Sequence, residues 1–300
     1  MPLRARDFES RASTSSTIAA VCLWVPVYLK LLGLSIGCII VGTMSKIIAV
    51  VNQKGGVGKT TTTMNLAASL AETGKFVLLV DMDPQANATS GFGIVHTDLP
   101  HGIYEALAGQ KRIHDIVLNT AHEGLRIAPA TRNLAGAAVE LVSVNRREFQ
   151  LADLLEEMRH AYDYIIIDCP PSLGLLTINA LVAADEILIP VQAEYYALEG
   201  LGQLMETIGL IQKHVKPELG VLGAVITMFD GRNKLSTDVM NELYKFFPNT
   251  IFKSVIPRTV RLAEAPSFGK SIFHYEPNGK GAKAYERLAR EILDIHEALS

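Results

Sequence analysis

Short apolar runs alternate with longer amphipathic stretches from Lys46 to the end of the chain. The runs are rich in β-branched residues, as buried parallel strands are, and the longer stretches repeat apolar residues at helical spacing. We expect strands at Lys46–Asn52, Phe76–Val80, Leu125–Ala128, Tyr164–Ile167, Glu186–Ile189, Gly220–Ile226 and Thr250–Val255. We expect helices at Thr61–Thr73, Arg147–His160, Leu198–His214, Ser236–Phe246 and Lys283–Ala298. This alternation predicts an α/β fold, a doubly wound and mostly parallel sheet with helices on both faces.

Three of the expected strands end in residues suited to chemistry. The loop 53–60 follows the first strand, Asp81 and Asp83 follow the second, and Asp168 ends the fourth. Ligands of an open parallel sheet bind beyond the carboxyl ends of its strands. The pattern therefore places the candidate site at that edge of the sheet.

The loop after the first strand has the composition of a phosphate-binding loop. Residues 54–62 read KGGVGKTTT, and the general pattern is G-x-x-x-x-G-K-[ST]. Its glycines let the backbone approach phosphate oxygens, and the loop N–H groups and the following helix N-terminus face the anion. In this pattern Lys59 reaches the terminal phosphates and Thr60 ligates Mg²⁺. We expect the nucleotide to contact Lys54, Gly55, Gly56, Val57, Gly58, Lys59, Thr60 and Thr61.

The front of this loop is unusual, because Lys54 supplies a second lysine where the general pattern has none. A loop of this kind resembles the deviant Walker A motif of the ParA/MinD family of ATPases. The resemblance runs from about Met44 to Ser300 and favours the Soj/ParA chromosome-partitioning branch. In that family the lysine matching Lys54 reaches across a dimer interface to the partner's nucleotide. The resemblance thus implies an ATP-dependent homodimer in which Lys54 and Lys59 are catalytic.

Two carboxylates complete the expected hydrolytic site. Asp168 matches a Walker B carboxylate, which with Thr60 holds Mg²⁺, and the CPPSLG that follows resembles the family's switch II segment. By resemblance, Asp83 orients or deprotonates the attacking water; the alternative is a turn or helix-capping role before Pro84. The family's usual form has glycine where Ala86 stands. We expect slow, partner-stimulated hydrolysis of ATP to ADP and phosphate.

The base is expected to be adenine. Proteins specific for GTP usually carry Asn-Lys-x-Asp, and the NKLS at 233–236 lacks the aspartate. In the family the adenine packs against the segment after the last strand, which corresponds here to Pro257 and Thr259. Relatives often have asparagine at the second of these positions.

Three arginines form the expected DNA-binding surface. The family's arginines matching Arg232 and Arg261 contact DNA without sequence preference, and Arg258 lies in the same run as Arg261. Such binding rests on phosphate neutralisation and weakens with salt. The alternative is that these arginines pair with Asp230 or Glu264. No helix-turn-helix or zinc-finger pattern points to base recognition.

The resemblance implies a nucleotide-timed switch. ATP binding sandwiches two nucleotides between two subunits, and the dimer places two weak basic patches side by side so that their affinities multiply. A ParB-like centromere-binding partner then stimulates hydrolysis and releases the DNA. The function expected is partitioning of chromosome or plasmid DNA by a cytoplasmic, nucleoid-associated ATPase.

Composition agrees with this picture and limits it. The chain has 300 residues, 49% of them hydrophobic, which suits one large α/β domain with an added segment. The net charge is −3, so nucleic-acid binding must come from a local patch. Cys22, Cys38 and Cys169 show no metal or redox spacing, which argues against a disulfide framework and for a reducing compartment.

Residues 1–43 differ from the rest of the sequence. The segment 18–42 is apolar apart from Pro26 and Lys30, and about 20 apolar residues suffice to cross a bilayer. It can be read as a membrane anchor, as a cleaved signal or transit peptide, or as upstream sequence outside the working protein. Because Met44 looks like a natural start, we expect a single P-loop ATPase domain at 44–300 with a dispensable extension. Membrane association is expected only if 18–42 is a true anchor.

Two related classes of protein are alternatives to this interpretation. A MinD-like positioning ATPase needs a basic amphipathic C-terminal helix, whereas residues 288–300 carry Glu291, Asp294 and Glu297 and no lysine. Segment 18–42 is the remaining route to a MinD-like membrane role. An iron–sulfur reductase with the same loop needs two cysteines per subunit for its cluster, and only Cys169 lies in the body.

Overall fold

The computed structural model describes residues 44–194, 197–246 and 250–299. All of these belong to one compact unit, Thr43–Ser300. Cys22, Cys38 and the apolar segment 18–42 lie outside the described residues. Among the described helices, none is both long enough and apolar enough to cross a membrane.

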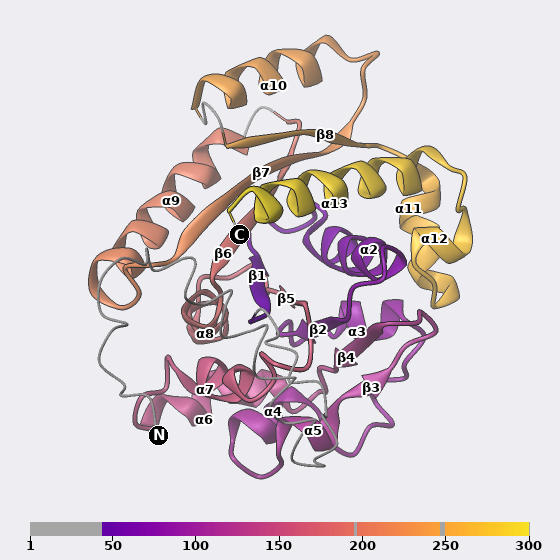
Figure 1. The fold of residues 1–300 in the computed structure, drawn as a ribbon. Coiled ribbons are helices and arrows are strands. Elements are labelled where there is room, and N and C mark those ends of the chain that lie inside the picture. Colours follow the sequence, from indigo (N-terminus) through magenta and orange to yellow (C-terminus); the bar gives the residue numbers. More distant parts are fainter. Residues whose placement is uncertain (1–43, 195–196, 247–249, 300) are drawn as a thin grey trace, which may run out of the picture. The chain divides into compact units, whose positions relative to one another are not determined.

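An eight-stranded sheet in the order β3-β4-β2-β5-β1-β6-β7-β8 forms the centre of this unit (Figure 1). All the pairings are parallel except that of β3 with β4 at one edge. The strands are β1 (Lys46–Val50), β2 (Val77–Asp81), β3 (Leu118–Asn119), β4 (Leu125–Ala128), β5 (Tyr164–Asp168), β6 (Glu186–Gln192), β7 (Gly220–Phe229) and β8 (Ile251–Pro257). The predicted α/β class, doubly wound and mostly parallel, is confirmed.

Helices cover both faces of the sheet (Figure 1). The longer ones are α2 (Lys59–Glu72), α8 (Leu175–Ala183), α9 (Ala197–His214), α10 (Lys234–Phe246) and α13 (Lys280–Leu299). The shorter ones are α3 (Asn87–Gly91), α4 (Ile103–Leu107), α5 (Ile113–Ile116), α6 (Leu134–Glu140), η1 (Leu141–Ser143), α7 (Gln150–Glu156), α11 (Val260–Glu264), η2 (Ala265–Phe268) and α12 (Ile272–Tyr275).

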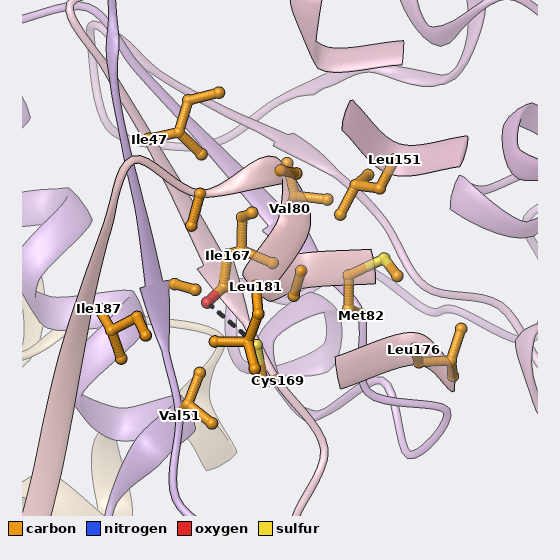
Figure 2. Packing of buried hydrophobic residues seen from close by; sticks show 14 of the residues in the cluster. Ile47, Val51, Val80, Met82, Leu151, Ile167, Cys169, Leu176, Leu181 and Ile187 are labelled. Atoms are coloured by element: carbon orange, nitrogen blue, oxygen red, sulfur yellow. Dashed lines mark hydrogen bonds between the residues drawn. The ribbon is translucent and has the colours of Figure 1, made fainter. Parts of the chain in front are cut away.

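Alternate residues of the central strand β1 are buried in two separate hydrophobic cores, since successive side chains of a strand point to opposite faces. Ile47 and Ala49 of β1 join the core beneath α7, α8 and α9, part of which Figure 2 shows around Ile167 and Cys169. Ile48 and Val50 join the core beneath α2 and α13. Both faces of β1 are thus apolar, which explains its continuous hydrophobic run.

Helix α13 packs against the phosphate-loop helix α2. Its Leu288, Ala289 and Ile292 are buried in the core they share, and the Tyr285 hydroxyl lies 3.3 Å from Oγ1 of Thr62. The end of the chain therefore forms part of the support for the beginning of the domain.

The observed elements differ from those predicted in three informative places. Strand β6 continues through Pro190 to Gln192, because β7 pairs with it that far, and the proline lies beyond the pairing with β1, which ends at Leu188. The expected helix at 147–160 is shorter, and α7 runs only from Gln150 to Glu156. The antiparallel edge strand β3 has two residues, too few to leave a periodic signal.

Candidate nucleotide site and nucleic-acid interface

The loop between β1 and α2 has the backbone shape that its glycines allow. Gly56 and Gly58 both lie in the left-handed region, at φ 74° and 88°, where side chains with a Cβ are disfavoured. Gly58 is the residue before the first turn of α2, and no side chain caps that helix N-terminus. The N–H groups of this turn can donate hydrogen bonds to an anion.

Lys59 folds back over this loop. Its buried Nζ donates a 3.0 Å hydrogen bond to the carbonyl oxygen of Lys54. Burial lowers the pKa of Lys59, and the nearby charge of Asp168 opposes that shift. The ammonium is therefore held next to the loop by one carbonyl, and this contact can be exchanged for a phosphate oxygen.

Lys54 lies on the outer side of the loop and makes an ion pair within its own subunit. Its Nζ is 3.2 Å from Oε2 of Glu194. The same glutamate accepts a 2.6 Å hydrogen bond from Nε2 of Gln192 and lies 3.6 Å from the guanidinium of Arg258. One carboxylate thus joins the loop lysine to an arginine predicted to contact DNA. Sequence reasoning missed Glu194, because nothing near it in the sequence indicates its partners.

Asp168 stands at the end of β5 and faces two hydroxyls of α2. Thr60 Oγ1 donates to its Oδ2 at 2.8 Å, and Thr63 Oγ1 donates to its Oδ1 at 2.9 Å. Thr60 and Thr63 share a helix face because they are three residues apart. The run of threonines was visible in the sequence, but the contact of Thr63 was not predicted.

Asp81 is the register partner of Asp168 on the neighbouring strand β2, and both side chains are fully buried. Burial, with the neighbouring Asp81 charge added, raises the pKa of Asp168 to about 8. Burial likewise raises the pKa of Asp81 to about 6, although Thr89 donates to Asp81 Oδ2 through both its N–H and its hydroxyl. Two buried carboxylates side by side leave negative charge that a cation can neutralise.

Asp83 is buried just beyond β2, and its Oδ1 accepts a 2.9 Å hydrogen bond from the N–H of Gln85. This is the turn contact weighed as the alternative to a catalytic role, and it engages one of the two carboxylate oxygens. Ala86, in the same turn, has φ 52° and a fully buried side chain. The family's usual glycine at this position fits a left-handed backbone, which explains the preference.

A pocket of about 360 Å³ opens beside the phosphate loop. Gly58 and Thr61 form its wall on the loop side, and Pro257 and Thr259 lie on the opposite side. The Thr259 hydroxyl accepts a 3.2 Å hydrogen bond from the N–H of Arg261 and so caps α11. The lining of the pocket is mainly apolar, which suits the flat face of a base.

Two further polar contacts hold the loop in place. Thr227 Oγ1, near the end of β7, donates a 2.7 Å hydrogen bond to the carbonyl of Val57. Asn52 donates through Nδ2 to the carbonyl of Pro190 at 2.7 Å and accepts from the N–H of Lys54 at 2.9 Å. These side chains tie the loop to β6 and β7 on one side of the sheet.

The three arginines predicted to contact DNA are exposed and paired with acids of the same subunit. Arg232 pairs with Asp230 at 2.8 Å, and Arg261 pairs with Glu264 at 2.9 Å. The segments that carry Arg232 and Arg258 are adjacent, because the N–H of Arg258 donates to the carbonyl of Phe229 at 2.9 Å. Exposed pairs of this kind contribute little to stability, so phosphate oxygens can replace the carboxylates.

Comparisons with known proteins identify proteins that are similar to this chain. A family described as AAA domain matches residues 45–221. The sporulation initiation inhibitor protein Soj of Bacillus subtilis (strain 168) is 55% identical over 249 residues, 83% of this chain and 98% of that protein. The chromosome partitioning protein ParA of Myxococcus xanthus is 51% identical over 251 residues, 84% of this chain and 89% of that protein.

Solved structures share the fold. One, described as cobyrinic acid a,c-diamide synthase from Mycobacterium smegmatis with bound ADP and magnesium, has a TM-score of 0.77 and 36% identity; the match covers 86% of this chain and 97% of that one. The septum site-determining protein MinD from Pyrococcus horikoshii, complexed with Mg-ADP, has a TM-score of 0.67 and 29% identity, with 83% and 96% covered. The chain therefore belongs to the ParA/Soj family of chromosome-partitioning P-loop ATPases.

Proposed function

We propose that this protein is an ATP-driven dimerising switch that binds DNA without sequence preference and partitions chromosome or plasmid DNA with a ParB-like partner. The observation that carries the proposal is Glu194, which is bonded to Lys54 of the phosphate loop and lies beside Arg258. Because the two cations share one carboxylate, a change in the position of Lys54 alters the charge balance around Arg258. This gives nucleotide state a direct route to the DNA-binding surface.

The site suits ATP with Mg²⁺. The loop 54–61 offers backbone donors to phosphates, and the pocket lined by Pro257 and Thr259 offers an apolar wall to adenine. A hydroxyl from Thr60 and a carboxylate from Asp168, beside the buried Asp81, form the hard oxygen donor set that Mg²⁺ prefers. Bound there, Mg²⁺ would neutralise phosphate charge during hydrolysis.

Each remaining side chain has a proposed part in hydrolysis. Lys59 exchanges the Lys54 carbonyl for terminal phosphate oxygens and stabilises their charge. Asp83 orients or deprotonates the attacking water through the oxygen that Gln85 leaves available. Lys54 releases Glu194 and reaches the partner subunit's nucleotide, so that hydrolysis is complete only in the dimer.

The DNA-binding surface is proposed to contain Arg232, Arg258 and Arg261. These side chains are exposed. Arg232 follows β7, Arg258 follows β8 and lines the nucleotide pocket, and Arg261 lies in α11. Their intramolecular acids keep the surface weakly attractive in the monomer. Two such surfaces joined in a dimer bind a duplex more tightly, in the cytoplasm at the nucleoid.

A MinD-like positioning role is the second candidate, supported by the shared fold. The packing of helix α13 argues against a MinD-like role in which the C-terminal helix binds the membrane. Helix α13 buries Leu288 and Ile292 against the sheet, and Glu291 accepts a 3.0 Å hydrogen bond from the N–H of Lys253. The apolar face that a membrane would need is already covered within the subunit.

The test is binding of the full chain to random-sequence duplex DNA with ATP and with ADP. We expect binding with ATP only, and Arg261→Glu should abolish it while ATP hydrolysis without DNA continues. Arg112→Glu is a matched control, because Arg112 is also exposed and also pairs with an acid three residues on, Asp115. Absence of DNA binding in every nucleotide state, with ATPase activity intact, would favour the MinD-like role.

A further inference from the structure

Three side chains capable of binding a metal meet at the end of α2 remote from the phosphate loop. Glu72 is the last residue of α2, His122 lies between β3 and β4, and His274 belongs to α12. One ligand atom from each residue lies within 4.8 Å of the others. The three segments are far apart in sequence, so the fold itself brings these groups together.

His122 is the unusual member of this group. Its side chain is 2% exposed, and neither ring nitrogen has a hydrogen-bond partner among the described residues. Oε1 of Glu72 is 3.6 Å from Nδ1, beyond hydrogen-bond length. A buried polar group left without a partner destabilises the folded protein, so a ligand that engages this ring would remove that penalty.

The imidazole of His274 lies flat against that of His122. The ring centroids are 3.6 Å apart, and the planes are inclined by 11°. An uncharged imidazole keeps one nitrogen lone pair available, which is the state that binds a metal.

We propose that Glu72, His122 and His274 form a binding site for a divalent transition metal of the zinc class. Two imidazole nitrogens and one carboxylate oxygen are a donor set that zinc accepts, and a three-residue site leaves a fourth position for water. Glu72 and His274 are exposed, so the metal has a path from solvent.

The site is distinct from the proposed Mg²⁺ position. Helix α2 begins at Lys59 and ends at Glu72, which separates the two by about 20 Å at 1.5 Å per residue. A metal at its far end would link α2, the β3–β4 connection and α12. The proposal therefore predicts stabilisation of the fold by zinc and does not depend on the proposed function.

The test uses the full chain after removal of metals by chelation, with zinc chloride as the probe. We expect one zinc per subunit by equilibrium dialysis and a rise in the thermal unfolding midpoint as zinc is added, because zinc binds the folded state. Cobalt in place of zinc should give the visible absorption of a site with mixed nitrogen and oxygen ligands. Glu72→Gln and His274→Gln should weaken zinc binding by about tenfold or more, and both change exposed side chains.

Two further variants make the result decisive. His122→Phe keeps an aromatic ring in the core and removes both nitrogens, so it should abolish the zinc-dependent rise in the unfolding midpoint. His114→Ala removes an exposed histidine elsewhere and should leave zinc binding unchanged. The proposal is overturned if zinc does not bind stoichiometrically, if His114→Ala weakens it as much as His274→Gln does, or if His122→Phe binds zinc like the unchanged protein.

Discussion

The ammonium of Lys54 and the carboxylate of Glu194 form a 3.2 Å ion pair within one subunit. Both side chains are partly exposed, at 36% and 45%. If Lys54 is to reach a partner's nucleotide, it must first leave this glutamate. The ion pair is thus an intramolecular competitor of the proposed dimer contact, and it favours the monomer.

Replacing Glu194 by glutamine should strengthen ATP-dependent dimerisation. The pair is exposed enough that releasing one copy is worth about 0–1 kcal/mol, and each dimer releases two copies, so the dimer dissociation constant should fall by up to about thirtyfold. Sedimentation with a non-hydrolysable ATP analogue measures this. Glu206→Gln, on an exposed position of α9, is the control for charge alone. Weaker dimerisation of Glu194→Gln would show that Glu194 supports the interface instead.

Replacing Asp168 by asparagine should stabilise the metal-free protein and abolish hydrolysis. The folded state raises the pKa of Asp168 from about 3.8 to about 8 through burial and Asp81. Its contribution to stability is therefore full below pH about 3.8 and lost as pH rises toward about 8. The thermal midpoint of Asp168→Asn, relative to the unchanged protein, should rise across that interval.

Mg²⁺ provides the check on this prediction. Magnesium with ADP should raise the unfolding midpoint of the unchanged protein and narrow its difference from Asp168→Asn. The exposed Asp238→Asn should show no such pH-dependent difference. If the difference in unfolding midpoint between Asp168→Asn and the unchanged protein stays the same from about pH 4 to pH 8, the raised pKa is wrongly assigned to Asp168.

Replacing Arg159 by alanine should destabilise the fold by about 1–3 kcal/mol. Arg159 donates to both oxygens of Asp185, at 2.8 and 3.0 Å, and Asp185 also accepts from the N–H of Ile47 at the start of β1. Burial alone would raise the pKa of Asp185, but these hydrogen bonds hold it below its ordinary value. The stabilisation should thus be present above pH about 3.8 and lost as pH falls further.

Urea unfolding at neutral and acidic pH measures the effect of Arg159→Ala. The loss of stability should be largest at neutral pH and should shrink as Asp185 is protonated. Arg287→Ala, an exposed arginine of α13, should change stability by less than about 0.5 kcal/mol. An equal loss of stability in both variants would show that the Arg159–Asp185 pair has no special role.

Replacing Ala86 by glycine should change stability by no more than about 1 kcal/mol. The left-handed backbone at φ 52° costs a non-glycine residue about 1–2 kcal/mol, which glycine relieves. The loss of a buried methyl and the greater freedom of the unfolded chain oppose this by a similar amount. Ala68→Gly is the matched control, because Ala68 is equally buried but helical, and it should cost about 2 kcal/mol. Equal losses at the two positions would contradict this account.

The sequence predicts the sheet and the residues that end its strands, because both depend on local patterns. The apolar runs mark the strands, and Asp81, Asp168 and the loop 54–62 follow from what comes directly after each run. Edge strand β3 has only two residues, and the extension of β6 past Pro190 depends on its pairing with β7. Neither leaves a periodic signal.

Contacts between distant residues are what sequence reasoning misses. Glu194 is separated from Lys54 by 140 positions, and His274 from His122 by more than 150. A lone glutamate or histidine is common and carries no pattern. Only the fold shows that these residues meet, which is why the lysine was predicted and its partner was not.

The contact between Tyr285 and Thr62 has a consequence for how the protein is made. The phosphate-loop helix α2 is synthesised more than 200 residues before helix α13, which covers it. Until α13 has been made, the apolar side of α2 lacks this partner, and a chain cut off before α13 would expose part of its core. Packing of the phosphate-loop helix is thus completed late in synthesis.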